Sequence, residues 1–269
     1  MNCELKTILT IAGSDSSAGA GIQQDLKTIT ALGEYGATVI TAVTSQNTLG
    51  VQGVMPLPAS VVKSQLEAVL SDLCVSAVKI GMIPNREVAE AIVESLKKYT
   101  LLLLCKASPG QVGAGGGFRM GIIYDPVMVS TSGTRLMSPD CVDYVVKHLF
   151  PLCTLVTPNL PEWEVIKRHL VNSSEPFSIL CKGGHAEGEM MTDTLYMPNG
   201  ETHEFSSPRI TTANLHGTGC TLSSAIATYL AKGESLPSAV AKAKEVINRG
   251  IEGGRHLSIG KGNGPLWLF

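Results

Sequence analysis

The chain has 269 residues, 44% of them hydrophobic and 16% charged, a balance that excludes a disordered protein and suffices for a large buried core. Its 21 Lys and Arg against 23 Asp and Glu give a formal net charge of −2, which excludes a broadly basic surface and predicts no nucleic-acid partner. We expect no membrane contact, because no apolar stretch is long enough to span a bilayer and no signal-peptide pattern is present. The seven scattered cysteines favour free thiols in a reducing, cytoplasmic location and supply no zinc motif.

Strand-like and helix-like segments alternate along the chain. Short apolar, β-branched runs predict buried strands, and apolar residues three and four positions apart predict amphipathic helices. The predicted strands cover residues 7–12, 38–44, 77–80, 121–124, 154–156 and 178–181. The predicted helices cover residues 22–32, 61–73, 88–96 (with Asn85 as its N-cap), 218–231 and 238–251. This alternation predicts a three-layer α/β/α sandwich around a mostly parallel sheet.

Two further segments modify this plan. Residues 192–196 and 202–206 are strand-like and flank Asn199-Gly200, which predicts an antiparallel hairpin at the edge of the sheet. Residues 108–119 are rich in glycine and predict a flexible inserted loop. Because no composition break marks a linker, we expect one domain over residues 1–269, interrupted by an inserted loop at about residues 106–120.

Residues suited to ligand binding follow the first two predicted strands, and ligands of α/β proteins bind at the carboxyl ends of strands. The glycines of residues 13–21 let the backbone approach a ligand closely, although a tight strand-to-helix turn explains them equally well. Gln46 carries a donor and an acceptor that can pair with the edge of a heterocycle. Taken alone, an amide that ties down a turn is the more ordinary interpretation of Gln46.

Oxygen-bearing side chains follow two later strands. Asp125 follows residues 121–124, and Asn159 and Glu162 follow residues 154–156. These residue types predict a magnesium site, because a hard cation takes oxygen ligands and keeps several waters. Asn159 and Glu162 also fit a helix capping box, and the two roles are compatible. Lys182, beside glycines after residues 178–181, suits a phosphate ligand or a solvated turn.

The strongest local signal is the segment His216-Gly217-Thr218-Gly219-Cys220, which leads directly into the predicted helix 218–231. Consecutive N–H groups at a helix N-terminus form a site for an anion. We expect the helix dipole to lower the pKa of Cys220 from its reference of about 8.5, so that the thiol can take a proton from a substrate hydroxyl. A buried small residue is the plainer interpretation of a cysteine, and we adopt it for the other six. No Walker A loop is present, so ATP chemistry would need a different scaffold.

Taken in order, these motifs resemble those of the hydroxymethylpyrimidine and phosphomethylpyrimidine kinases of thiamine synthesis, which are ribokinase-like kinases. The matching segments are residues 11–17, 19–27, 39–48, 81–82, 125–129, 157–162, 182–185 and 216–224. The resemblance runs from about residue 5 to about residue 250, apart from the glycine-rich segment. It implies a ribokinase-like fold, ATP and Mg²⁺ as cofactors, and a homodimer.

The resemblance also implies two ATP-dependent steps in one site. The first phosphorylates the hydroxymethyl group of 4-amino-5-hydroxymethyl-2-methylpyrimidine, and the second converts that monophosphate to the pyrophosphate. The resemblance implies that Gln46 pairs with the aminopyrimidine edge and that Met82 packs on the ring. Gly13, Ala20 and Asp25 complete the substrate pocket.

The same resemblance assigns the catalytic roles. Gly217, Thr218, Gly219 and Cys220 form an anion hole, in which Cys220 is the base. Lys182 holds phosphate oxygens. The nucleotide site comprises Asn159, Lys182 and Gly219, and the magnesium site comprises Asp125 and Glu162.

Two departures from the family pattern are present, and two alternatives remain. Ala18 stands where the family usually has Gly, and the glycine-rich segment is not part of the usual pattern. A pyridoxine or pyridoxal kinase shares the scaffold and the Cys, although Gln46 favours the aminopyrimidine. A non-catalytic pyrimidine-binding regulator is the alternative of another class, and the intact catalytic motifs argue against it. A dinucleotide-binding dehydrogenase is excluded, because no GxGxxG follows the first strand.

Overall fold

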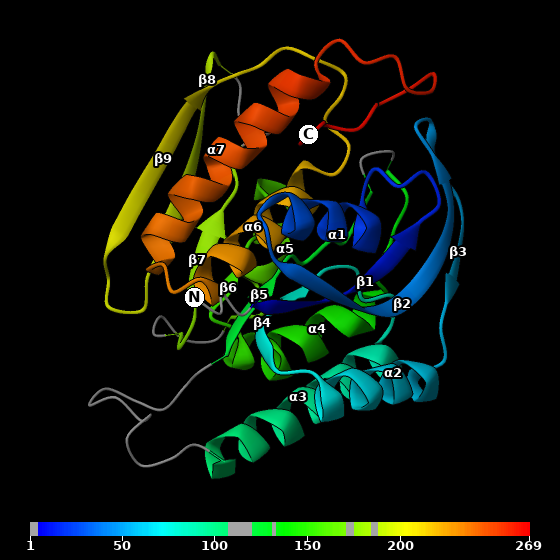
Figure 1. Cartoon of the computed structure of the whole chain (residues 1–269), viewed down its shortest axis with the longest axis vertical. Coiled ribbons are helices and arrows are strands. Elements are labelled where there is room, and N and C mark those ends of the chain that lie inside the picture. The colour runs from blue at the N-terminus through cyan, green and yellow to red at the C-terminus, as the bar shows by residue number, and fades with distance from the viewer. Residues whose placement is uncertain (1–4, 107–119, 131–132, 171–174, 184–187) are drawn as a thin grey trace.

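Strands and helices alternate along most of the chain (Figure 1). The structure is a computed structural model that describes residues 5–106, 120–130, 133–170, 175–183 and 188–269. The strands are β1 (Thr7–Asp15), β2 (Tyr35–Asn47), β3 (Gly50–Pro56), β4 (Val75–Ile80), β5 (Gly121–Tyr124), β6 (Leu155–Val156), β7 (Ser178–Cys181), β8 (Met190–Tyr196) and β9 (Thr202–Pro208). The helices are α1 (Gly21–Ala31), α2 (Ala59–Asp72), α3 (Arg86–Lys106), α4 (Pro139–His148), the short 3-10 helix η1 (Phe150–Leu152), α5 (Leu160–Ile166), α6 (Thr218–Ala231) and α7 (Leu236–Gly254).

The strands form one sheet in the order β3-β2-β1-β4-β5-β6-β7-β8-β9. The strands β2, β1, β4, β5, β6 and β7, which are neighbours in this order, run parallel, as the predicted βα alternation requires. The predicted hairpin is confirmed as β8 and β9: β8 pairs antiparallel with β7, and β9 pairs antiparallel with β8. The sequence analysis missed β3, which pairs antiparallel with β2 at the opposite edge. Glycines at Gly50 and Gly53 weaken the strand signal of this short segment.

Helices cover both faces of the sheet, which confirms the predicted α/β/α sandwich (Figure 1). Helices α2, α3 and α4 pack on one face, and α1, α6 and α7 pack on the other. Side chains of β1 alternate between the two hydrophobic layers, because successive residues of a strand point to opposite faces. Leu9 and Ile11 join the layer beneath α2 and α3, whereas Ile8 joins the layer beneath α6 and α7.

The predicted helices are present, and most are longer than predicted. The predicted helix 218–231 coincides with α6. The predicted cap of α3 is confirmed, because the Asn85 side chain accepts a hydrogen bond from the Val88 N–H at 3.0 Å. The sequence analysis missed α4, although Cys141, Val142 and Val145 have helical spacing and are buried on one face. The glycine-rich segment 108–119 lies outside the described residues.

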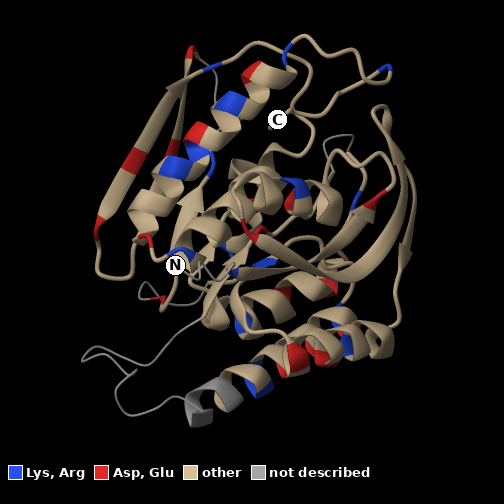
Figure 2. Ribbon diagram, in the orientation of Figure 1, with Lys and Arg blue, Asp and Glu red and all other residues tan. Residues whose placement is uncertain are grey.

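The parallel strands all end on the same side of the sheet, and most of the motif residues lie in the loops that follow these carboxyl ends. Figure 2 shows charges of both signs along α3 and α7 rather than one continuous basic face. No disulfide joins the cysteines in the described part of the chain. Within that same part, no helix is both long enough and apolar enough to cross a membrane.

Candidate active site

A cavity of about 430 Å³ lies at the carboxyl ends of the parallel strands. Its wall combines the loops that follow β1, β4, β5, β6 and β7 with the end of β2, the start of α6 and part of α7. It contains every site residue predicted from sequence except Asp25. These lining residues are Gly13, Ala20, Gln46, Met82, Asp125, Asn159, Glu162, Lys182, Gly217, Thr218, Gly219 and Cys220.

Asp25 lies behind the cavity wall instead of lining it, contrary to the prediction. Its carboxylate is fully buried and accepts hydrogen bonds from the Thr10 hydroxyl at 2.5 Å and the Ser224 hydroxyl at 2.8 Å. The Lys79 ammonium lies 2.8 Å from both of its oxygens. A carboxylate held by so many buried donors has no free face for a substrate ring, so its role is to support the wall.

Lys79 is a lining residue that the sequence analysis missed. It is the one charged residue in the apolar strand β4, a signal that a buried carboxylate partner exists elsewhere in the chain. Burial opposes the charge of Lys79, but the nearby groups of Asp25, Cys220 and Asp125 outweigh it and hold its pKa above the ordinary value. The Lys79 ammonium therefore stays protonated beneath the cavity, where the Asp25 carboxylate balances its charge.

The N-terminus of α6, where the anion site is predicted, lies in the wall of the cavity. Gly217 precedes the helix with a φ of +88°, and a Cβ there would lie 1.9 Å from the Gly19 carbonyl oxygen. Only glycine fits both conditions, so the loop after β1 and the start of α6 are in backbone contact. The Thr218 N–H donates to the Leu215 carbonyl at 3.3 Å. The N–H groups of Gly219 and Cys220 have no acceptor within the helix and can bind an anion.

Cys220 is a partly exposed residue of the cavity wall, in the first turn of α6. The expected lowering of its pKa is wrong: burial raises the pKa of Cys220 to about 11. The Lys79 ammonium and a hydrogen bond from the Gly21 N–H favour the thiolate, whereas Asp25 and Asp125 oppose it. The thiol is therefore almost entirely protonated at neutral pH, because desolvation and two carboxylates outweigh the helix terminus.

A second charged cluster adjoins the anion site. The Lys182 ammonium lies 2.6 Å from Asp125 Oδ1, and the Thr157 hydroxyl donates to the same oxygen at 3.3 Å. A Cβ on Gly219 would lie 3.1 Å from Asp125 Oδ2 and 3.7 Å from Lys182 Nζ. The absence of a side chain at Gly219 therefore leaves the N-terminus of α6 open to both charged groups.

Asn159 and Glu162 form the predicted capping box at the start of α5. The Asn159 side chain accepts from the Glu162 N–H, and the Glu162 side chain accepts from the Asn159 N–H, both at 2.8 Å. Burial raises the pKa of Glu162 to about 7; Lys182 opposes this shift and Asp125 adds to it. At neutral pH this carboxyl is close to its titration midpoint.

The carboxylates suit a hydrated hard cation better than a fully coordinated one. No group of three or more His, Cys, Asp or Glu residues within the described ranges could hold a metal. Asp125 and Glu162 offer only oxygen atoms, and both line the cavity. Mg²⁺ commonly binds through one or two carboxylates while it keeps waters and phosphate oxygens as its other ligands. This donor set therefore fits Mg²⁺.

Four of the predicted substrate residues, Gly13, Ala20, Gln46 and Met82, line the same cavity. A Cβ on Gly13 would lie 3.0 Å from the Met82 sulfur, so the bare backbone of Gly13 and the Met82 thioether are in close contact. This arrangement provides a flat, apolar surface of the kind that a heterocyclic ring packs against. Gln46 lines the same cavity from the end of β2 and carries the polar edge.

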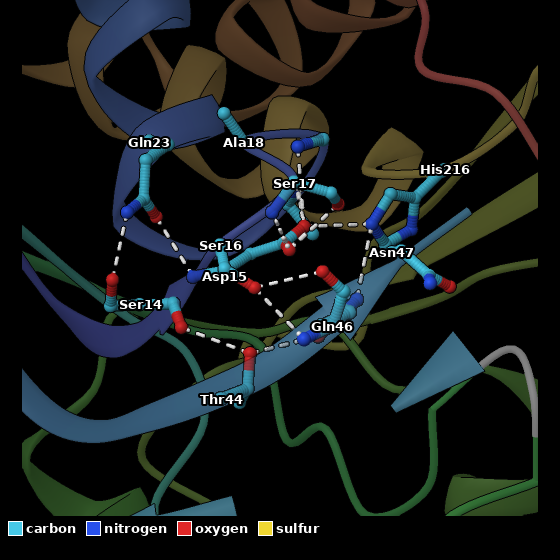
Figure 3. Close-up of polar contacts among 12 residues, drawn as sticks. Ser14, Asp15, Ser16, Ser17, Ala18, Gln23, Thr44, Gln46, Asn47 and His216 are labelled. Carbon is cyan, nitrogen blue, oxygen red and sulfur yellow. Dashed lines mark hydrogen bonds and ion pairs between the residues drawn. The ribbon is translucent and has the colours of Figure 1, made fainter. Parts of the chain in front are cut away.

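Gln46 is also joined to a network that the sequence analysis missed (Figure 3). His216 Nε2 lies 2.8 Å from Asp15 Oδ2 and 3.2 Å from Gln46 Nε2. Asp15 also accepts hydrogen bonds from the N–H groups of Ser17 and Ala20, at 2.8 and 2.9 Å. The Asp15 carboxylate thus shapes the loop after β1 and also contacts the residue that precedes Gly217. The contact spans 201 positions of sequence and has no local signal.

Comparison with known proteins gives consistent results. A family model described as phosphomethylpyrimidine kinase matches residues 15–105 and 117–267. A hydroxymethylpyrimidine/phosphomethylpyrimidine kinase of Rhizobium meliloti (strain 1021) is 43% identical over 276 residues, which cover 97% of this chain and 96% of that protein.

Solved structures show the same likeness. The crystal structure of a phosphomethylpyrimidine kinase from Clostridium difficile 630 has a TM-score of 0.73 at 40% identity, and the match covers 91% of this chain and 99% of that one. A Staphylococcus aureus pyridoxal kinase in complex with pyridoxal has a TM-score of 0.80 at 30% identity, and the match covers 98% of this chain and 93% of that one. These neighbours confirm the predicted ribokinase-like fold.

Proposed function

Because the chain belongs to the phosphomethylpyrimidine kinase family, we propose that it phosphorylates 4-amino-5-hydroxymethyl-2-methylpyrimidine and then its monophosphate, with ATP as the phosphate donor. The observation that carries the proposal is one cavity that joins an amide edge, Gln46, to the anion site of α6. A pyrimidine at the first can present its hydroxymethyl group to a phosphate at the second. The product pyrophosphate would serve thiamine biosynthesis.

Substrate recognition rests on complementary hydrogen bonds and an apolar surface. The 4-amino group and N3 of the ring form an adjacent donor and acceptor, which match the oxygen and nitrogen of the Gln46 amide. Gly13, Ala20 and Met82 leave room for a flat ring beside that amide. Binding of this kind fixes the hydroxyl in place, and fixed position is a large part of what phosphoryl transfer requires of a protein.

The N-terminus of α6 and the charged groups beside it would neutralise the charge of the phosphate. The N–H groups of Gly219 and Cys220 meet the negative charge that develops on the transferred phosphoryl group. We assign the phosphate oxygens to Lys182 and the nucleotide to Asn159, both of which line the cavity. Asp125 and Glu162 would hold Mg²⁺ through its waters, and the bound ion would neutralise charge on the phosphate oxygens.

Cys220 is the base that accepts the hydroxyl proton. Its raised pKa means that only a small ionised fraction is active at neutral pH. A small fraction is enough, because a hydroxyl in a loose phosphoryl-transfer transition state loses its proton late. Lys79, beneath the thiol, stabilises the thiolate when it forms.

The experiment is an ATP turnover assay on the purified chain with three separate substrates: the hydroxymethylpyrimidine, its monophosphate and pyridoxal. Products are identified by mass. Turnover of both pyrimidines supports the proposal, whereas turnover of pyridoxal alone would replace the substrate and keep the mechanism. Pyrimidine binding without turnover of any substrate would favour the regulator. Omission of Mg²⁺ should abolish turnover. We also propose that the chain forms a homodimer, which light scattering tests, and that it works in the cytoplasm.

A further inference from the structure

His216 Nε2 carries a hydrogen. It lies 2.8 Å from Asp15 Oδ2, and a carboxylate can only accept hydrogen bonds. Asp15 is ionised at neutral pH: burial works against its charge, but hydrogen bonds from His216 and Ser17 outweigh burial and hold its pKa below the ordinary value. Both partners are nearly buried, with side-chain exposures of 10% for His216 and 3% for Asp15. The Nε2–H of His216 therefore points at Asp15, and the nitrogen has no lone pair left to accept a hydrogen bond from Gln46.

This hydrogen determines which of the two orientations of the Gln46 amide is stable. If Gln46 Nε2 lies 3.2 Å from His216 Nε2, two hydrogen-bond donors face each other, which is unfavourable. Gln46 Oε1 lies 3.1 Å from the Thr44 hydroxyl, which is also 3.0 Å from the Ser14 carbonyl oxygen. A hydroxyl has one hydrogen, which it would have to divide between these two acceptors. When the amide turns over, the Thr44 hydroxyl donates to the Ser14 carbonyl alone and accepts from Gln46 Nε2. Gln46 Oε1 then faces the Nε2–H of His216 and shares its hydrogen with Asp15, so the clash of two donors is removed.

We propose that Asp15 and His216 act as a positioning pair that holds the Gln46 amide with its oxygen toward His216, and that this sets the direction in which the enzyme reads its heterocycle. The inference rests on the proposed function. A carboxamide has two N–H groups and two oxygen lone pairs, so one of each remains after His216 and Thr44 are served. That remaining donor and acceptor pair with N3 and the 4-amino group of the ring.

The direction has a consequence for catalysis. The amide oxygen binds the amino group, so the amino group lies on the His216 side of the ring. The hydroxymethyl group is on the next ring carbon, C5, and so lies on that side as well. His216 directly precedes Gly217 and the anion site in the chain. The pair Asp15 and His216 therefore turns the reacting hydroxyl toward the N-terminus of α6.

The test uses an analogue with the opposite hydrogen-bond pattern. In 5-hydroxymethyl-2-methylpyrimidin-4-one the exocyclic group is an acceptor and N3 carries a hydrogen, so only the reversed amide can pair with it. The wild-type enzyme should prefer the amino substrate in kcat/KM by about 100-fold or more. His216→Leu frees the amide, and the preference should fall by about tenfold or more, because the oxo analogue gains while the amino substrate loses.

His216→Gln is the matched control, because its amide N–H stands as many bonds from Cα as Nε2 of histidine, and it should keep most of the preference. Thr44→Val removes the partner on the other side of the amide and should lower the preference even if His216→Leu fails to fold. A purely structural role would lower kcat/KM for both substrates equally; an unchanged ratio in His216→Leu and Thr44→Val would overturn the proposal. A wild-type enzyme that does not phosphorylate the amino substrate would overturn the proposed function and the positioning pair with it.

Discussion

The Lys79 ammonium lies 2.8 Å from both carboxylate oxygens of Asp25, and neither side chain is exposed. The pair joins β4 to α1 directly beneath the cavity and lies close enough to Cys220 to affect its pKa. Removal of one member of a buried ion pair leaves the other charge uncompensated. The pair therefore links the stability of the fold to the reactivity of the thiol.

We predict that Lys79→Met lowers the free energy of unfolding by about 3 kcal/mol, measured by urea denaturation. It should also raise the pKa of Cys220 further, because it removes the cation that favours the thiolate, and so slow alkylation of this thiol at pH 9. Lys63→Met is the control: its partner Glu94 is largely exposed, so a change of less than about 1 kcal/mol is expected. Equal effects of the two variants would contradict the role given to the buried pair.

The proton acceptor should be visible in the pH dependence of the chemical step. If Cys220 acts as thiolate, the single-turnover rate should rise about tenfold per pH unit from pH 7 to 9, because the pKa of the thiol is raised to about 11. Cys220→Ala should bind the pyrimidine normally, turn over far more slowly and lose this slope. A flat profile in the wild-type enzyme, or equal turnover by the variant, would exclude the thiolate as the base.

Glu162 should make the metal-free protein less stable as pH rises. Its pKa is raised in the folded state, so the folded protein binds this proton more tightly than the unfolded chain does. That contribution to stability is complete below about pH 4.5 and is lost as pH rises to about 7. Glu162→Gln should therefore be more stable than wild type at pH 8, by an amount on the order of 2 kcal/mol, and similar to it at pH 4.5.

The measurement is urea unfolding in the presence of a chelator at both pH values. Glu67→Gln serves as the control, because Glu67 is largely exposed and should leave the pH dependence unchanged. A lower stability of Glu162→Gln at pH 8 would show that the capping hydrogen bonds of the carboxylate outweigh the cost of its burial. Glu162→Gln should at the same time turn over more slowly, since it weakens the proposed Mg²⁺ site.

Ala18 carries backbone strain that glycine would relieve. Its φ is +61°, and Ala18 is the one non-glycine with positive φ in the described part of the chain. The left-handed conformation costs an L-residue roughly 1–2 kcal/mol, whereas glycine loses about 0.5–1 kcal/mol through the greater freedom of its unfolded chain. Ala18→Gly should raise the free energy of unfolding by about 0.5–1 kcal/mol, measured by urea denaturation.

Ala20 provides the comparison for that experiment, because its φ of −141° is ordinary extended backbone. Ala20→Gly should lower the stability by about 0.5 kcal/mol. Stabilisation by both substitutions, or by neither, would mean that the φ of Ala18 is not a source of strain. These two variants therefore measure how much the alanine at position 18, where the family usually has glycine, changes the free energy of unfolding.

The sequence was most informative where function depends on local chain geometry. The carboxylate after β5 and the capping box of α5 could be placed at the ends of parallel strands, which the fold brings together. The glycines at positions 217 and 219 could be placed at a helix N-terminus. The parallel direction of the central strands followed from the alternation of strands and helices. All of these are properties of short segments.

What could not be predicted depends on contacts between distant segments or on burial. The partners of Asp25 and His216 lie 54 and 201 positions away, so neither pair leaves a pattern in its own neighbourhood. The sequence placed Cys220 correctly at a helix N-terminus, but the direction of its pKa depends on desolvation and on Asp25 and Asp125. The burial of the thiol and its distances to these carboxylates are fixed only when β4, β5 and α1 pack around it.

The central claim is that both phosphorylations occur in this one cavity, and paired rate measurements on Cys220→Ala and Gln46→Leu test it most directly. Each step is followed by mass, with the hydroxymethylpyrimidine or its monophosphate supplied separately. We predict that Cys220→Ala depresses both steps by a similar large factor and that Gln46→Leu raises KM for both pyrimidines. Retention of one step at the wild-type rate in either variant would contradict a single shared site.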